Sequence, residues 1–469
     1  MNGPHPERNR AQWALAERGG CYVANQAANQ AAGQAQDLPG RGGIWQRPDS
    51  LWEATAPPPP ALPVLQDSVQ ADVLVIGGGF TGLSAGLHAA EAGKRVVVLE
   101  ASELGRGASG RNNGQVIPTL TRPDPANLID RFGWETGERF VGLIRDSAST
   151  LFDLVRRLGI DCAAEQTGWV QPVHSPGRIK IAERRATQWG KFGADVELLD
   201  RAAVSAILGT DAYFGGWMNR TGGHINPLAL VRGLAAKVVA AGAAVYVNSP
   251  AVSVERRGES WVVRTPQGVV TADALVLGTN GYAAAVFPEI RTEVVPVLSW
   301  QMATAPLGDN IRKTILPGRQ AMSDTHGDLR FMRYTADNRL VTGGALLNPV
   351  NGAERLKRIV GTRLAGMFPA LNGIAFNYVW NGRIAMTTDY FPRVHQLGPN
   401  GFAWAGCNGR GVALSISLGR ELARAAIGQD PKDLALPFTQ PTPLPFNALL
   451  QRIGPLKILQ YRWNDAREV

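Results

Sequence analysis

The chain has little cysteine, little histidine and no long apolar run, and each shortage excludes a class of protein. Its three cysteines among 469 residues (Cys21, Cys162 and Cys407) form no CxxC pair. This argues against a disulfide framework or a cysteine-built metal site and favours a reducing compartment, the cytoplasm. The six histidines show no HExxH or comparable spacing, so we expect no metal. No run approaches the roughly 18 apolar residues of a transmembrane helix, and no signal-peptide core is present.

The charge balance is basic, but the basic residues are dispersed. The sequence has 48 Lys and Arg against 39 Asp and Glu, for a net charge of +9. No stretch combines dense Lys and Arg with interleaved aromatic residues, so we expect no nucleic-acid partner. A bound dinucleotide and an acidic substrate account more simply for local positive charge. The sequence does not indicate an oligomeric state.

The first part of the chain differs in composition from the rest. Residues 1–48 are rich in Gln, Asn, Ala and Gly and lack periodic hydrophobic residues, which predicts a flexible N-terminal extension. The remainder supports a sizeable core, since 45% of the chain is hydrophobic, and its length predicts two or more domains.

A glycine-rich turn follows the first strongly apolar run. Residues 71–82 read Ala-Asp-Val-Leu-Val-Ile-Gly-Gly-Gly-Phe-Thr-Gly, which predicts a strand and a turn. A helix over 83–92 and a second strand over 96–99, ending at Glu100, complete the unit. This order is typical of dinucleotide-binding proteins.

Each glycine of this turn, and the acidic residue after it, has a structural role in dinucleotide binding. Gly77 permits the tight turn, Gly79 lets backbone N–H groups approach a pyrophosphate, and Gly82 lets the helix pack closely on the sheet. Glu100 follows about 20 residues later, where a carboxylate can accept from ribose hydroxyls and disfavours the 2′-phosphate of NADP.

A second glycine-rich strand-to-helix turn lies far along the chain. A strand at 402–405 leads into Gly406-Cys-Asn-Gly-Arg-Gly411 and a helix over 412–427. A protein that binds only NAD needs its glycine turn and neighbouring units close together in sequence, so this distribution favours FAD.

Between the two turns, the hydrophobic periodicity predicts further elements. Helices are expected at 138–158, 178–192 and 228–241. Strands are expected at 244–247 and 274–277, with a hairpin of 261–265 and 269–271. Residues 293–345 alternate as in an antiparallel sheet, with a turn at 336–339.

The two turns belong to a longer series of motifs, which comprises Val73–Gly82, Leu99–Ala101, Gly107–Gln115, Gly222–Pro227, Arg333–Arg339, Trp380–Arg383 and Ala405–Val412. In order and spacing this series resembles the FAD-dependent amine and amino-acid oxidoreductases, the superfamily of D-amino-acid oxidase, glycine oxidase and sarcosine oxidase. Within it, the chain is most similar to the gamma-glutamylputrescine oxidoreductase group.

The resemblance implies an α/β fold (α+β overall), with a Rossmann-like FAD-binding domain built from discontinuous segments and an antiparallel-sheet substrate domain. The FAD-binding domain would comprise residues 49–150, 228–290 and 380–430, and the substrate domain 151–227 and 291–379. We expect the tail, 431–469, to pack on the FAD domain. Its basic and aromatic segment 446–463 would also suit a membrane surface, although Pro455 interrupts it.

The same resemblance implies the cofactor residues. Gly77, Gly79 and Gly82 would hold the pyrophosphate, Glu100 the adenosine ribose, and the backbone of Val252 the adenine edge. Beside the diphosphate and isoalloxazine would run Ser109, Arg111, Asn112, Asn113 and Gly114. Arg383 and the helix N-terminus with Gly409, Gly411 and Val412 would approach the flavin ring. Neither Arg111 nor the cysteine-free stretch 380–392 offers a covalent link, so we expect non-covalent FAD.

Five residues are candidates for the substrate site. Relatives often have Ser-Gly-His-Gly where this chain has Asn408-Gly-Arg-Gly411, so Arg410 would favour an acidic substrate. Trp300, Arg333 and Tyr334 suit an aromatic wall and a carboxylate clamp; alternatively Trp300 is core and Arg333 a surface ion-pair partner. His224 either faces the flavin or caps the following helix.

The reaction implied is hydride transfer from an amine-bearing carbon to flavin N5, giving an imine that water hydrolyses. We expect a small amine or amino acid that carries a carboxylate, such as a gamma-glutamyl amine or an N-alkyl amino acid, with oxygen or a quinone as acceptor. Three alternatives stay open: a D-amino-acid dehydrogenase-like enzyme with a respiratory acceptor, a non-catalytic FAD-binding subunit, and an NAD-binding module.

Overall fold

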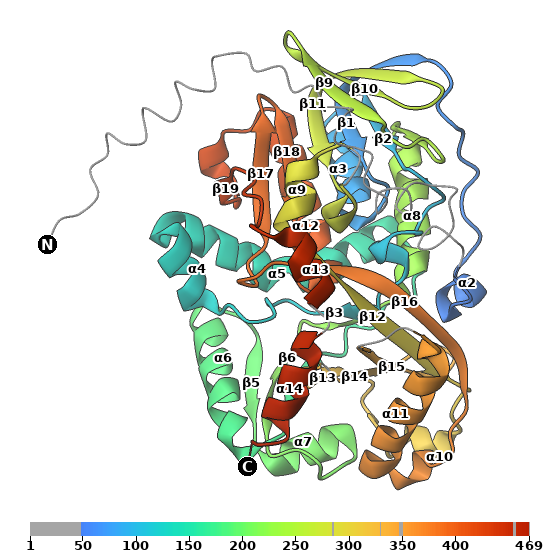
Figure 1. The fold of residues 1–469 in the computed structure, drawn as a ribbon, viewed down its shortest axis with the longest axis vertical. Helices are drawn as coiled ribbons and strands as arrows, with labels where there is room; N and C mark the ends of the chain where they lie inside the picture. Colours follow the sequence, from blue (N-terminus) through green and yellow to red (C-terminus); the bar gives the residue numbers. More distant parts are fainter. Residues whose placement is uncertain (1–47, 284–285, 329, 347–349, 454–455, 469) are drawn as a thin grey trace, which may run out of the picture.

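Two β-sheets dominate the computed structural model, which describes residues 48–468 apart from 284–285, 329, 347–349 and 454–455. Apart from its last residue, the predicted extension at 1–48 lies outside the described residues. One sheet occupies the upper half of Figure 1 and the other the lower half, with the long strands β12 and β16 running between them. None of the described helices is long and apolar enough to cross a membrane.

The first sheet has nine strands and a parallel centre. Strands β8, β2, β1, β11 and β18 are parallel neighbours, β17 and β19 follow at one edge, and the antiparallel strands β10 and β9 extend from β11. The strands are β1 (Ser68–Ile76), β2 (Val96–Leu99), β8 (Ala244–Tyr246), β9 (Ser253–Arg257), β10 (Ser260–Arg264), β11 (Val269–Leu277), β17 (Arg393–Gly398), β18 (Gly401–Ala405) and β19 (Phe438–Thr439). This order confirms the predicted α/β class and the 261–271 hairpin.

Four helices pack on one face of this sheet: α3 (Phe80–Glu91), α5 (Trp134–Leu158), α8 (Pro227–Ala240) and α12 (Gly411–Ala426). Their apolar side chains and those of one strand face form the largest core cluster. The hairpin β9–β10 and helix α9 (Pro288–Glu293) cover the other face with a second cluster. The central strands are therefore buried on both sides, which explains their continuous apolar runs.

The second sheet has eight strands, in the order β16-β12-β15-β14-β13-β4-β6-β5, and is antiparallel apart from the β13–β4 pair. Its strands are β4 (Trp169–Pro172), β5 (Val196–Leu199), β6 (Gly216–Asn219), β12 (Val295–Thr304), β13 (Ala321–Ser323), β14 (Phe331–Tyr334), β15 (Leu340–Gly344) and β16 (Phe376–Met386). Helices α7 (Arg201–Leu208) and α11 (Gly352–Met367) contribute to its core.

Shorter elements complete the described chain. The two-stranded sheet pairs β3 (Gln115–Val116) with β7 (Gly223–His224). The remaining α-helices are α2 (Leu51–Thr55), α4 (Pro125–Phe132), α6 (Ile179–Lys191), α10 (Asp309–Arg312), α13 (Asn447–Ile453) and α14 (Lys457–Asp465). Short 3-10 helices lie at Ala108–Gly110, Pro176–Arg178, Asn280–Tyr282, Pro369–Leu371 and Pro431–Asp433.

The segments differ from the expected ones at three points. Helix α5 runs across the expected domain boundary at residue 150 and packs against α12, one of the helices that cover the first sheet. Strand β16 pairs with β12 as far as Met386, so residues 380–386 belong to the second sheet. The tail was expected on the FAD domain: its residues 434–438 pack in the core cluster of the first sheet, whereas α13 and α14 contact β12 and the loop at 324–328. The Gly327 N–H and the Asp328 carboxylate of that loop, which bond Asp465 and Arg462 of α14, account for the difference.

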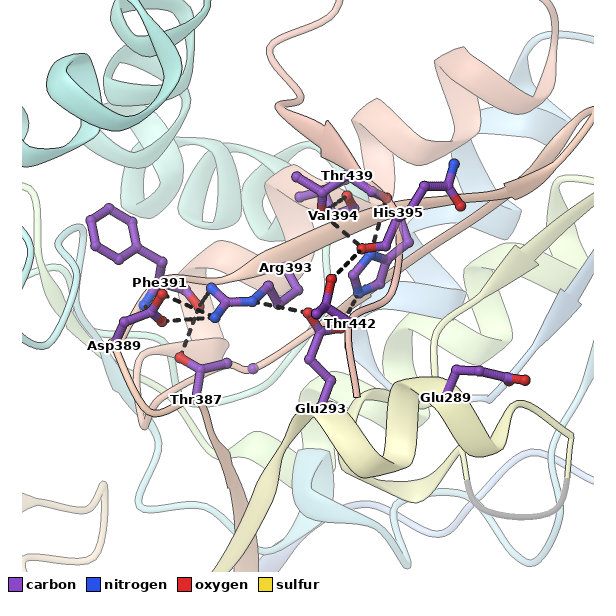
Figure 2. Close-up of polar contacts among 12 residues, drawn as sticks. Glu289, Glu293, Thr387, Asp389, Phe391, Arg393, Val394, His395, Thr439 and Thr442 are labelled. Atoms are coloured by element: carbon purple, nitrogen blue, oxygen red, sulfur yellow. Dashed lines mark hydrogen bonds and ion pairs between the residues drawn. The ribbon is translucent and has the colours of Figure 1, made fainter. Parts of the chain in front are cut away.

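A buried ionic cluster pins the start of β12 to the first sheet. Figure 2 shows the Glu293 carboxylate, at the end of α9, between Arg393 and His395 of β17. Its oxygens lie 3.1 Å from Arg393 Nε and 2.8 Å from His395 Nε2. Arg393 also donates to Asp389, and His395 Nδ1 lies 3.2 Å from the Thr439 carbonyl oxygen.

We expect Glu293→Ala to lower the free energy of unfolding by about 3 kcal/mol, because it leaves the half-buried Arg393 and the buried His395 without the carboxylate between them. Urea denaturation measures the change. The control is Glu289→Ala on the same helix, whose side chain points away from the cluster in Figure 2 and which should change stability by less than about 0.5 kcal/mol. Equal losses in the two variants would contradict a specific role for the cluster.

Candidate functional site

A long cavity lies where the two sheets meet, and its first part is the turn from β1 to α3. Residues 77–81 line it. Gly77 has φ +108°, and its Cβ would lie 3.0 Å from the Gly278 carbonyl oxygen. Gly79 is the N-cap of α3 and has no side chain to bond the first turn, so the positive end of the helix faces the cavity. Gly82 lies outside the cavity and serves packing, since its Cβ would lie 1.8 Å from the Gly77 carbonyl oxygen.

Glu100 closes this end of the cavity. Its carboxylate accepts from the Gly78 N–H at 2.8 Å and the Ser102 N–H at 3.0 Å. Burial raises the pKa of Glu100, while these backbone donors oppose the rise. An acceptor held in this way is suited to the hydroxyls of a ribose.

The loop after β2 forms the next stretch of wall. Ser109, Arg111, Asn112 and Asn113 all line the cavity. Ser109 Oγ accepts from the Phe80 N–H at 3.1 Å, which joins this loop to the first turn of α3. Arg111 donates to the Arg106 carbonyl at 2.7 Å, and burial lowers its pKa.

The far end of the cavity is the turn before α12. Gly409, Arg410, Gly411 and Val412 line it together with Arg383 of β16. Gly409 has φ +80°, and the buried amide of the preceding Asn408 bonds the Thr387 N–H and the Gly406 carbonyl, which fixes the turn. The two predicted glycine turns thus line one cavity although they are far apart in sequence.

Arg410 supplies an uncompensated cation to this cavity. Its side chain is 6% exposed, and its guanidinium lies 4.8 Å over the Trp169 ring. Within the described part of the chain the guanidinium has no hydrogen bond or ion pair with a side chain or carbonyl. Burial lowers the pKa of Arg410 to about 9, and the nearby Arg185 adds to this effect. A buried positive charge without a hydrogen bond or ion pair is stabilised by an anionic ligand.

The second sheet provides a wall that the sequence interpretation missed. Ser299 and Gln301 of β12, Ser323 of β13 and Phe331 of β14 line the cavity. The missed signal in β12 is the alternation of a strand, in which residues 299 and 301 share one face and Trp300 the other.

Trp300 and Tyr334 do not line the cavity; both lie in the core of the second sheet. The predicted aromatic wall is corrected accordingly: the ring of Trp300 packs at Gly352, where a Cβ would lie 2.8 Å from it.

Arg333 is also absent from the cavity wall, because backbone carbonyls occupy its guanidinium. It donates to Asn113 at 2.8 Å, Tyr334 at 2.9 Å and Ile225 at 2.8 Å. The predicted carboxylate clamp is thus replaced by a bracing role. A Cβ at Gly114 would overlap this guanidinium, so Gly114 makes room for Arg333 and does not line the cavity.

His224 and Val252 also lie outside the cavity wall. His224 Nε2 lies 3.1 Å from the Arg319 carbonyl oxygen, and burial lowers its pKa to about 3, so the ring is neutral. It therefore neither faces the cavity nor caps α8, whose N-cap is Asn226. The Val252 N–H already donates to the Arg264 carbonyl at 2.8 Å, and its neighbour Ala251 lines the cavity instead.

The donors, glycines and shape of the cavity fit FAD. A continuous wall connects the N-termini of two helices, α3 and α12, with a ribose acceptor at one end. Thr279 is one of the lining residues, and its buried hydroxyl has no hydrogen-bond partner among the residues that the structure describes. Such a group in a native protein indicates a partner that the chain alone does not supply.

Comparison with known proteins agrees with this fit. The family model DAO, described as FAD dependent oxidoreductase, matches residues 72–425. The chain is 31% identical over 382 residues to gamma-glutamylputrescine oxidoreductase of Escherichia coli (strain K12), covering 81% of this chain and 89% of that protein. It is 23% identical over 380 residues to glycine oxidase of Bacillus licheniformis, covering 77% and 94%.

Solved structures share the fold. Glycine oxidase from Geobacillus kaustophilus superposes with a TM-score of 0.65 at 20% identity, covering 77% of this chain and 95% of that one. L-proline dehydrogenase from P. horikoshii gives 0.65 at 19% identity, covering 79% and 96%. The resemblance predicted from the motifs is confirmed: the chain belongs to the DAO family of FAD-dependent oxidoreductases.

Proposed function

We propose that this protein oxidises a C–N bond of a small amine or amino acid, with FAD as a non-covalent cofactor. The observation that carries the proposal is the single cavity, which runs from the β1–α3 turn past the α12 turn to polar side chains of the second sheet. A dinucleotide would fill the first part and leave the second part for a small polar substrate. The names of the relatives, gamma-glutamylputrescine oxidoreductase and glycine oxidase, support this substrate class.

The cofactor residues follow from the cavity wall. Residues 77–79, at the N-terminus of α3, would hold the pyrophosphate, and Glu100 the ribose. Ser109, Arg111, Asn112 and Asn113 would run along the diphosphate, and Arg383 with residues 409–412 would face the ring. FAD supplies the hydride acceptor for the carbon that bears the amine. The reaction also requires exclusion of water and orientation of the substrate, and these tasks fall to the second sheet.

Non-covalent binding is supported by the lining residues, which include no histidine in the described chain. The one cysteine of the wall, Cys407, lies with its thiol 3.8 Å from the Ala385 carbonyl oxygen. The free thiols of Cys407 and Cys162 also agree with a reducing compartment such as the cytoplasm.

We further propose that the substrate carries a carboxylate and that Arg410 binds it. The guanidinium lies 4.8 Å over the ring of Trp169, whose own Nε1 donates to Ser323 Oγ at 2.9 Å. This arrangement fixes the fork of donors before the substrate arrives, which suits bidentate recognition of a carboxylate. Gln301 and Ser299 add neutral polar groups for the rest of the molecule.

An absorbance spectrum of the purified protein tests the function. We expect flavin bands that bleach when carboxylate-bearing amines and amino acids are added without oxygen. Acid precipitation should release the flavin into the supernatant. Flavin that no substrate pool bleaches would instead favour a non-catalytic subunit, and a colourless protein after reconstitution with FAD would refute the proposal.

The electron acceptor separates two versions of the same chemistry. Peroxide formed during turnover in air would identify an oxidase. Bleaching without peroxide, followed by recovery of the bands on adding a soluble quinone, would identify a dehydrogenase like the D-amino-acid enzymes with respiratory acceptors.

A further inference from the structure

The C-terminal helices α13 and α14 present an apolar face to solvent. The side chains of Phe446, Leu449, Ile453, Leu456, Leu459 and Trp463 are exposed by 43% (Ile453) to 81% (Phe446). The other exposed large apolar side chains of the described chain are spread between Trp134 and Ile359. Both helices, dark red in Figure 1, lie on the near side of the molecule. A run of exposed apolar side chains of this kind marks a surface that binds a partner.

Polar side chains on the opposite side of the two helices hold them to the body. Asn447 Nδ2 donates to the Thr292 and Val294 carbonyls. Asp465 accepts from the Gly327 N–H at 2.9 Å, and the Tyr461 hydroxyl lies 2.6 Å from that of Tyr390. A helix that packs on a globular protein normally buries its apolar stripe. Here Leu449, Ile453, Leu459 and Trp463 of the two helices are exposed instead. A partner beyond the described residues explains this orientation.

The charges around this face indicate what the partner is. The acidic groups of α14 and the residues after it, Asp465 and Glu468, are both turned toward Arg178 of the body. Lys457 and Arg467 are exposed, and Arg467 lies 3.6 Å over the Trp463 ring at the edge of the apolar face. The face is thus apolar with a cationic border and an aromatic residue at its rim, which is the pattern of helices that lie on anionic lipid.

We propose that α13 and α14 dock the protein on the surface of an anionic lipid bilayer, with the six apolar side chains in the interface. A second copy of the chain fits less well, because a two-fold contact through this face would place Lys457 and Arg467 of both copies in one interface without an acidic residue of the face to pair with them. Docking does not depend on the proposed reaction, but it favours a lipid-soluble quinone over oxygen as the acceptor.

Vesicle flotation of the full-length protein tests the proposal. We expect binding to vesicles of about three parts phosphatidylcholine to one part phosphatidylglycerol, and at least about tenfold weaker binding to pure phosphatidylcholine or in high salt. The triple variant Leu456→Ser, Leu459→Ser, Trp463→Ser should lose binding by more than about a hundredfold, given the apolar area removed. These side chains are exposed, so the variant should keep its melting temperature.

The matched control replaces exposed residues of the same types elsewhere, Leu198→Ser with Trp134→Ser, and should bind vesicles like the unmodified protein. Equal flotation with neutral and anionic vesicles, or no flotation, would overturn the proposal. So would self-association, seen by light scattering, that the triple variant abolishes, because the face would then be a subunit interface. None of these outcomes changes the flavin-bleaching result, so the two proposals fail separately.

Discussion

Gly82→Ala is expected to yield protein that retains less than about a tenth of the normal flavin, because its Cβ would lie 1.8 Å from the Gly77 carbonyl oxygen. The turn cannot absorb this overlap. Gly77 already lies against Gly278, whose own Cβ would be 2.8 Å from the Gly82 nitrogen. Relief requires α3 to move off β1, which removes the helix N-terminus from the cavity. The ratio of flavin to protein absorbance after gel filtration measures the loss.

The control for this variant is Gly142→Ala, a helical glycine of α5 with open space at its Cβ position. Here the alanine should stabilise the helix by up to about 1 kcal/mol and leave the flavin content unchanged. Full flavin occupancy in the Gly82 variant would show that the close approach of α3 to β1 is not required for binding.

The dinucleotide half of the fold could be predicted because its signals are local. Strand, glycine turn, helix, second strand and Glu100 fall within one short segment, and the parallel pairing of β1 with β2 follows from that unit. The second turn, before α12, carries its own glycines. No local pattern predicts that β11 and β18 bring these two segments to one cavity. That prediction came from the family resemblance.

The residues of the substrate wall were harder to predict, because each residue type there suits two roles. Trp300 and Gln301 are neighbours on one strand, and the large aromatic side chain suited either a pocket or a core. The alternation of side chains along β12 decides which of the two faces the cavity, but only once the buried face of the strand is known. The predicted role of Arg333 was wrong for a different reason. Its partners Asn113 and Ile225 lie more than a hundred residues away in the sequence, so no spacing in the sequence reveals them.

Arg410→Met is expected to lower kcat/KM for a carboxylate-bearing substrate by about a hundredfold or more, because removing one partner of a buried ionic contact costs about 3 kcal/mol. For an analogue with an amide in place of the carboxylate, the loss should be less than about threefold. The Arg410 guanidinium has no hydrogen bond or ion pair in the described chain, so methionine also removes an uncompensated buried charge. The variant should therefore be at least as stable as the unmodified protein and keep its flavin. Anaerobic bleaching kinetics with the two substrates measure the difference.

Arg410→Lys distinguishes charge from geometry at the same position. Lysine keeps the positive charge but not the planar fork that lies on Trp169, so an intermediate loss is expected for the carboxylate and almost none for the amide. Losses of the same size for both substrates in the methionine variant would mean that Arg410 acts on the flavin or the turn and not on the substrate. An unchanged preference for the carboxylate would place the anion elsewhere in the cavity. In either case bleaching by the amide analogue would still report C–N oxidation, so this test separates the substrate's anchor from the reaction itself.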